Sequence, residues 1–362
     1  MIIPELPEYL TRLGGAEHKG LIIALFTITA MVSRPFSGKL SDTLGRVPVM
    51  MAGAVVCFFC SLMYPILTTV SAFFLLRLVH GFSTGFTPTG QTTYLADIIP
   101  AEKRGEAIGI LGTAGTLGMA LGPAIGGFIA NWYGLPFMFY TSSFCGLVSF
   151  LILLKMKETL QEKRPFSIAA IRVSRKDLFE PNVIVPCAVM VLIAYAYGTI
   201  FTIIPDFSNH LGVANKGLVF TFITVSLLIV RLLAGKASDR YGRVPVLLIS
   251  VFFLVVSLVI ISLANNVVML MLGASLYGLS HGATSPTLLA WAADLSDEQH
   301  KGRGIGSLYI CMEFGIGLGA FSSGLLYGNK NSHFMLVFLI AGSLSLIGFI
   351  YLVLNHFKSK LI

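Results

Sequence analysis

The sequence predicts an all-α polytopic membrane protein, on the basis of its composition, its long charge-free stretches and an internal repeat. Of the 362 residues, 55% are hydrophobic and 12% are charged, whereas soluble domains carry about 25% charged residues. Residues 107–154 and 244–293 contain no Asp, Glu, Lys or Arg over 48 and 50 positions. One span needs ~20 apolar residues, so each stretch holds two spans. This composition excludes a soluble enzyme, a nucleic-acid-binding domain and a disordered scaffold.

Eleven apolar runs of span length, interrupted by charges or by Gly and Pro, predict eleven membrane helices. Each run is apolar throughout, which favours helices over the alternating pattern of membrane barrel strands. The runs fall at about 17–41, 48–69, 71–97, 104–130, 135–157, 182–205, 216–238, 244–264, 267–294, 303–327 and 333–355.

The distribution of Lys and Arg between the loops predicts the orientation. If the loop at 38–48 is cytoplasmic, loops on that side carry 18 of the 25 Lys and Arg residues, and the opposite loops carry 4. The positive-inside rule then places the C-terminus in the cytoplasm of a multi-pass protein of the cell membrane, which is the inner membrane in a bacterium. Arg34, Arg77 and Arg231 fall inside spans, and Arg34 and Arg231 are expected to extend toward the cytoplasm.

The chain contains an internal repeat at an offset of 197 residues, because segments 34–50 and 231–247 share ten of seventeen residues. With six helices in each copy, the halves are parallel repeats related by an axis along the membrane normal. Residues 6–10 align with 204–208, near the end of the seventh helix, so the first helix of twelve is expected upstream of Met1. The predicted organisation is an N-terminal bundle at 1–157, a basic cytoplasmic linker at 158–181 and a C-terminal bundle at 182–362.

The repeated segment, GKLSDTLGRVP at 38–48 and GKASDRYGRVP at 235–245, predicts a cytoplasmic gate. Its glycines permit close helix contact or a left-handed helix end. Its Asp and Arg residues are expected to form exposed ion pairs at the surface, with Asp97 and Asp294, at the ends of helices, as partners of Arg46 and Arg243. A charge network that breaks as the halves move would act as a latch. The predicted gate residues are Gly38, Asp42, Gly45, Arg46 and Asp97 in the first repeat and Gly235, Asp239, Gly242, Arg243 and Asp294 in the second.

These features resemble the major facilitator superfamily over essentially the whole chain. The loop signature GxxxDxxGR, its second copy, the half-to-half repeat and the basic central linker all match. The resemblance implies the major facilitator fold, with two six-helix bundles, a central cavity and alternating access. Eleven of its twelve spans are present, and the first is lacking. Thr43 and Val47 stand where the family often has basic residues, which implies a weaker first latch.

A glycine pattern in the run at 104–130 resembles that of the proton-coupled antiporters in this superfamily that export drugs and metabolites. Glycines every three or four residues form a smooth groove for the partner bundle, and Pro bends the helix. An ordinary Gly-rich packing helix is the alternative. The second copy has Ala320 in place of the Pro, which favours a specific role for the first. The pattern comprises Gly109, Gly118, Gly122, Pro123, Gly126 and Gly127.

Charged groups within spans are expensive and by default functional. Arg77 resembles the family's fourth-helix arginine, which implies a role in proton coupling; the alternative is an Arg bonded to backbone carbonyls of the missing first helix. Glu313 lies ten residues past Arg303, ~15 Å into the membrane, and is either a proton-binding site or a neutral acid bonded to a neighbouring helix. His281 binds substrate, titrates, or is a satisfied core histidine. Cavity residues, with ordinary packing as the alternative, are Thr84, Thr87, Gln91, Tyr195, Tyr197 and Tyr277.

The sequence thus predicts a secondary transporter that exports a small amphiphilic molecule in exchange for protons, as a monomer in the lipid bilayer. No P-loop motif is present, so ATP is not the expected energy source, and no enzyme activity, cofactor, metal or nucleic acid is expected. Two alternatives remain, a proton-coupled nutrient importer and a transporter-shaped sensor. The cysteines, interpreted as packing residues, are Cys57, Cys60, Cys145, Cys187 and Cys311.

Overall fold

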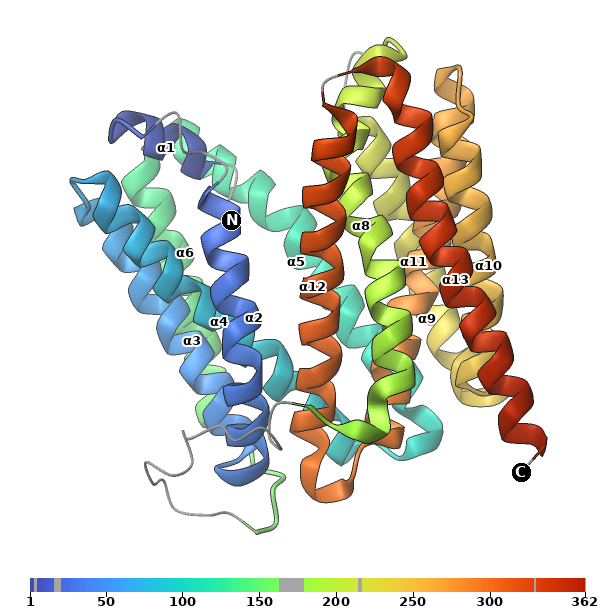
Figure 1. Ribbon diagram of the computed structural model, residues 1–362. Coiled ribbons are helices and arrows are strands. Elements are labelled where there is room, and N and C mark those ends of the chain that lie inside the picture. The colour runs from blue at the N-terminus through green and yellow to red at the C-terminus, as the bar shows by residue number, and fades with distance from the viewer. Residues whose placement is uncertain (3–4, 16–20, 163–178, 214–216, 329, 362) are drawn as a thin grey trace. The chain divides into compact units, whose positions relative to one another are not determined.

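The computed structural model describes residues 1–2, 5–15, 21–162, 179–213, 217–328 and 330–361, and all regular elements within these ranges are helical. Figure 1 shows their order along the chain. The first half contains α1 (Leu6–Arg12), α2 (Leu21–Thr43), α3 (Arg46–Met63), α4 (Val70–Ile98), α5 (Arg104–Tyr133) and α6 (Leu135–Leu154). The second half contains α8 (Ile184–His210), α9 (Gly217–Tyr241), α10 (Arg243–Ser262), α11 (Val267–Leu295), α12 (Lys301–Tyr327) and α13 (Phe334–Leu361).

The helices from α2 onward coincide with the eleven runs expected from the sequence. Seven described helices are long and apolar enough to cross a membrane, and eight if the bent α9 counts as one span. Outside this set are α2, α4 and α5, which are rich in Gly, Ser and Thr. The predicted all-α polytopic fold is therefore confirmed.

The chain forms two compact units that exchange two short segments. Unit 1 comprises 1–98, 114–180 and 296–310, and unit 2 comprises 99–113, 181–295 and 311–362. Relative to the organisation expected from the repeat, the start of α5 packs with the second half and the start of α12 with the first. Most of the expected linker, at 163–178, lies outside the described residues.

The repeat is visible in the packing of each unit. In unit 1, α4 packs on α2 through glycines: a Cβ added at Gly81 would lie 2.5 Å from the backbone oxygen of Phe26. In unit 2, α11 packs on α9 in the same register, because a Cβ at Gly278 would collide with the backbone oxygen of Ile223. Both contacts pair residues related by the offset of 197. Small residues thus set the closest helix contacts, as in other membrane helices.

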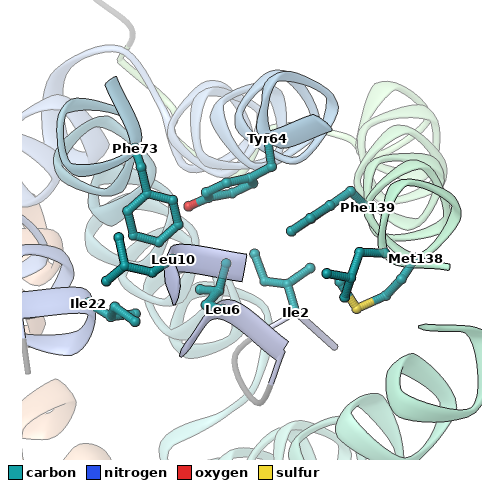
Figure 2. Packing of buried hydrophobic residues seen from close by; sticks show 9 residues of the cluster. Ile2, Leu6, Leu10, Ile22, Tyr64, Phe73, Met138 and Phe139 are labelled. Carbon is teal, nitrogen blue, oxygen red and sulfur yellow. The ribbon is translucent and has the colours of Figure 1, made fainter. Parts of the chain in front are cut away.

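The short helix α1 closes one end of unit 1. Leu6 and Leu10 are fully buried against Tyr64, Phe73 and Phe139, which come from the turn after α3, from α4 and from α6 (Figure 2). The Tyr9 hydroxyl donates to the backbone oxygens of Tyr64 and, at 3.2 Å, of Leu67. Burying Leu side chains contributes about 1.5–3 kcal/mol each, so this segment is an integral part of the unit.

The glycines that join α2 to α3 and α9 to α10 differ from the left-handed helix end expected from the sequence. Gly45 has φ 126° and ψ 162°, and Gly242 has φ 92° and ψ 159°. Positive φ with an extended ψ is essentially restricted to Gly. The requirement for Gly is therefore confirmed, but the conformation is different because each glycine directly precedes the next helix.

Candidate functional site

Inside unit 1, the end of α2 contacts the first turn of α12. The Asp42 carboxylate accepts hydrogen bonds from the backbone N–H groups of Gly302, at 2.7 Å, and Arg303, at 2.9 Å. The first N–H groups of a helix have no acceptor within that helix, and the helix dipole favours an anion there. Asp42 therefore caps a helix that begins far away in the sequence. We define the first latch as Gly38, Asp42, Arg46 and Asp97 with the backbone of residues 302–303.

Arg46 holds the Asp42 carboxylate in place from the start of α3. Its Nη1 lies 3.0 Å from Asp42 Oδ1, and its Nε lies 3.0 Å from Asp97 Oδ2. The three side chains are 2–11% exposed, so the pairs are buried, whereas the sequence predicted exposed surface pairs. Burial raises the pKa of Asp42 to about 6, against the opposing effect of Arg46 and the two backbone donors. Removing one partner of a buried ion pair leaves an uncompensated charge, which costs more than an exposed pair contributes.

Unit 2 repeats this geometry with the counterparts at the offset of 197. Asp239 accepts hydrogen bonds from the backbone N–H groups of Gly105 and Glu106, both at 2.8 Å, in the first turn of α5. Arg243 pairs with Asp239 and, through Nε at 2.8 Å, with Asp294. We define the second latch as Gly235, Asp239, Arg243 and Asp294 with the backbone of residues 105–106.

Each latch contains a direct contact between two glycine backbones. A Cβ on Gly302 would lie 2.7 Å from the backbone oxygen of Gly38, and a Cβ on Gly38 would lie 2.9 Å from the backbone oxygen of Gly302. In the second latch, the corresponding distances between Gly105 and Gly235 are 2.7 and 2.5 Å. Because backbone atoms cannot rotate away, each of these positions requires Gly.

Arg34 and Arg231 form a third repeated contact and do not extend toward the cytoplasm as expected. Arg34 is 1% exposed, and its guanidinium lies 4.3 Å from the centre of the Tyr309 ring. Arg231 is 8% exposed and donates to the backbone oxygen of Gly112 at 2.7 Å. Tyr309 and Gly112 are themselves related by the offset of 197. Arg34 donates to the backbone oxygen of Gly85 and to Thr89 Oγ1 within its own repeat. A group of the other repeat also contacts each Arg, so both are held by the protein and neither reaches water.

Two glutamates that the sequence reasoning missed stabilise the first latch. Glu158, after α6, accepts hydrogen bonds from the backbone N–H groups of Arg46 at 2.9 Å and Val47 at 3.1 Å. Glu180 accepts from Arg303 Nε at 2.8 Å and is 2% exposed. Both belong to the expected linker, where an acidic residue resembles any other solvated charge, so no sequence signal distinguishes them.

Arg77 lies in a buried polar cluster of unit 1. Its Nε donates to the backbone oxygen of Ile22 at 3.1 Å, its Nη1 donates to the Tyr64 hydroxyl at 3.3 Å, and its guanidinium lies 4.4 Å from the centre of the Phe26 ring. The backbone acceptor is therefore a carbonyl of α2, whereas the alternative interpretation expected carbonyls of a first helix. Of the polar residues expected beside Arg77, Thr87 instead faces Gly53 of α3.

A cavity of about 150 Å³ in unit 2 brings together two of the predicted site residues. The ring centroids of Tyr197 and His281 lie 5.1 Å apart, and the Tyr277 ring stacks on His281 with a centroid distance of 5.8 Å. Tyr195 does not line the cavity, because its hydroxyl lies 2.6 Å from Ser322 Oγ. The cavity is lined by Met190, Ile193, Ala194, Tyr197, His281, Ser285, Met312 and Ile316.

Glu313 follows the cavity residue Met312 on α12. It is half-buried, and its carboxylate lies within electrostatic range of the Tyr197 hydroxyl. Among the described residues, the buried Tyr277 hydroxyl has no hydrogen-bond partner. Most of the residues that line the cavity are apolar, and a few polar groups lie close to it, as is usual for small-molecule sites.

The glycine pattern of α5 faces several different neighbours. A Cβ at Gly109 would lie 3.0 Å from the backbone oxygen of Arg231, which belongs to the second-repeat helix α9 of unit 2. Gly122 and Gly126 instead face Met1, whose backbone oxygen would lie 2.6 Å from a Cβ at Gly126. No atom lies within 4 Å of a Cβ at Gly118 among the described residues. The predicted contact with the partner bundle thus holds for Gly109, while Gly122 and Gly126 pack within their own unit because the N-terminal segment fills that groove.

Comparisons with known proteins identify relatives over most of the chain. An MFS-type transporter of Methanocaldococcus jannaschii is 24% identical over 90% of this chain and 86% of its own length. A multidrug resistance protein, MdtG of Escherichia coli (strain SMS-3-5), is 28% identical over 84% of this chain and 78% of its own length.

Solved structures share the fold. The human organic anion transporter MFSD10 superposes with a TM-score of 0.80 at 19% identity, covering 97% of this chain and 89% of that structure. The proton:xylose symporter XylE superposes with a TM-score of 0.79 at 15% identity, covering 97% and 90%. The family model of the Major Facilitator Superfamily matches residues 1–214 and 187–360. The chain therefore belongs to the major facilitator superfamily of transporters.

Proposed function

We propose that the protein is a secondary transporter that exports small amphiphilic molecules in exchange for protons. The observation that carries this proposal is the duplicated latch, in which a carboxylate of each repeat caps a helix of the other repeat. Because the same contact occurs in both repeats, it suits a transport cycle in which the two latches open and close together. In such a cycle, the contacts Asp42–Gly302 and Asp239–Gly105 break in one state and re-form in the next.

The cavity chemistry supports an amphiphilic substrate. Met190, Met312 and Ile316 provide flexible apolar walls, and Tyr197 with His281 provides an aromatic wall. Thioether side chains adapt to differently shaped apolar ligands. A sugar-like nutrient needs many paired polar groups, whereas among the described lining residues the polar side chains are Ser285, His281 and Tyr197. This favours export of an amphiphile over nutrient import.

Proton coupling is assigned to Glu313, with Arg77 and His281 as further candidates. Glu313 adjoins the cavity residue Met312 on α12, where a carboxylate can take up a proton and change the charge beside the substrate. Export rather than import is supported by the resemblance of the α5 glycine pattern to antiporters and by the relative named as a multidrug resistance protein. The proposal places the protein as a monomer in the cell membrane with its C-terminus in the cytoplasm.

The direction can be tested with purified protein in liposomes, with the orientation determined by protease access to the C-terminal tail. For molecules whose cytoplasmic face is outside, an acidic lumen should drive a fluorescent amphiphilic cation into the lumen while protons leave. A protonophore should abolish the accumulation. Movement of substrate and protons in the same direction would indicate an importer, and absence of flux for any probe would favour a sensor.

A further inference from the structure

Helices α8 and α12 lie side by side in unit 2 with a constant register. A Cβ on Gly315 would lie 2.6 Å from the backbone oxygen of Val191, and a Cβ on Gly319 would collide with the backbone oxygen of Tyr195. In both pairs the two residues are 124 positions apart. The glycines therefore bring the two helices into backbone contact over more than one turn.

One turn before this contact, the same register places Cys187 opposite Cys311. These cysteines are also 124 positions apart, and their side chains lie within interaction range of each other. Cys187 is buried, whereas Cys311 is half-buried. A disulfide needs Cα atoms about 4.4–6.8 Å apart, which requires the close helix approach that the glycine contacts one turn away impose.

We propose that Cys187 and Cys311 form an oxidisable thiol pair whose disulfide fixes α8 to α12 beside the cavity. With hydrogen peroxide as the oxidant, the thiolate of the more accessible Cys311 attacks one peroxide oxygen, giving a sulfenic acid and one water. The Cys187 thiol then attacks the sulfenic sulfur, and the sulfenic oxygen leaves as a second water. Two thiols are oxidised and one peroxide is reduced, and a reducing dithiol reverses the change.

The position of the pair gives the disulfide a consequence for transport. Met190 lies three residues after Cys187, and Met312 follows Cys311, so both walls of the cavity continue from the bridged positions. A covalent bond there prevents α8 and α12 from separating. The counterpart of Cys311 in the first repeat is Ala114, so this device belongs to the second half alone. In a reducing cytoplasm the thiols are the resting form.

The chemical test uses the full chain in lipid nanodiscs. Treatment with hydrogen peroxide should remove two of the five free thiols and yield a Cys187–Cys311 linked peptide by mass spectrometry without reduction. Cys187→Ser and Cys311→Ser should each abolish the linked peptide. Cys145→Ser, which changes an exposed cysteine of unit 1, is the matched control and should leave the linked peptide unchanged. Oxidation of Cys145 without the linked peptide would overturn the proposal.

The transport test rests on the proposed function. Peroxide should lower the rate of wild-type protein in liposomes several-fold, dithiothreitol should restore it, and both Cys→Ser variants should resist. An equal loss in Cys187→Ser would overturn the locking role. If the reduced wild-type protein moves no probe, the proposed function fails, while the linked peptide still decides whether the thiol pair exists.

Discussion

The contact between glycine backbones in the first latch predicts that Gly302→Ala opens it. The added Cβ would lie 2.7 Å from the backbone oxygen of Gly38 and 2.8 Å from Asp42 Oδ1. Ordinary contact begins near 3.4 Å, so the first turn of α12 must move away from α2. Overpacking of this kind costs about 1–3 kcal/mol, which shifts the closed-to-open equilibrium about 5- to 150-fold.

The opening can be measured by labelling Ser41→Cys with a membrane-impermeant maleimide. Ser41 is fully buried, its hydroxyl has no hydrogen-bond partner among the described residues, and its Cβ lies 2.8 Å from the Cβ position of Gly302. The labelling rate should rise about 5- to 150-fold in the Gly302→Ala background if it follows the open population. Gly317→Ala is the matched control on the same helix, because nothing described lies within 4 Å of its Cβ. Equal labelling rates in the two backgrounds would show that the added methyl group does not open the first latch.

The remaining predictions concern single side chains. Glu313→Gln should abolish proton flux in liposomes, measured with a luminal pH dye, while substrate binding persists; wild-type flux would contradict the assignment. Burial raises the pKa of Asp42 from its ordinary 3.8 to about 6. The contribution of Asp42 to the free energy of unfolding is therefore complete below pH 3.8 and is lost as pH rises through about 6. The difference in melting temperature between pH 5 and pH 7.5 should therefore be smaller in Asp42→Asn than in wild type, and an unchanged difference would exclude Asp42 as its source. Gly122→Leu should displace Met1 and lower stability by about 1–3 kcal/mol, and an unaltered melting temperature would show that this contact is dispensable.

The helices and the repeated ion pairs could be predicted from the sequence because both depend on local pattern. Apolar runs of span length define α2 to α13, and the offset of 197 links Arg46 and Asp97 to Arg243 and Asp294. Both pairings are confirmed by the structure. Their burial could not be predicted, because an Asp at a helix end looks like a surface charge until a distant segment covers it.

The capping of α12 by Asp42 depends on a contact between residues 260 positions apart. Backbone N–H groups carry no sequence signal, so the acceptor of Asp42 could not be inferred from residue types. The same reason applies to Glu158, which accepts from the backbone of α3. For Arg34 and Arg231, length and charge suggested that they reach water, whereas both are buried and donate to groups of the protein.

Asp42 and Asp239 satisfy the otherwise unpartnered N–H groups of α12 and α5. Hydrogen exchange measured by mass spectrometry tests it directly, because these amides have no acceptor within their own helices. Asp42→Asn should speed exchange at residues 302–303 and leave residues 105–106 protected, and Asp239→Asn should do the reverse. Unchanged protection at 302–303 in Asp42→Asn would show that the Asp42 carboxylate does not cap α12.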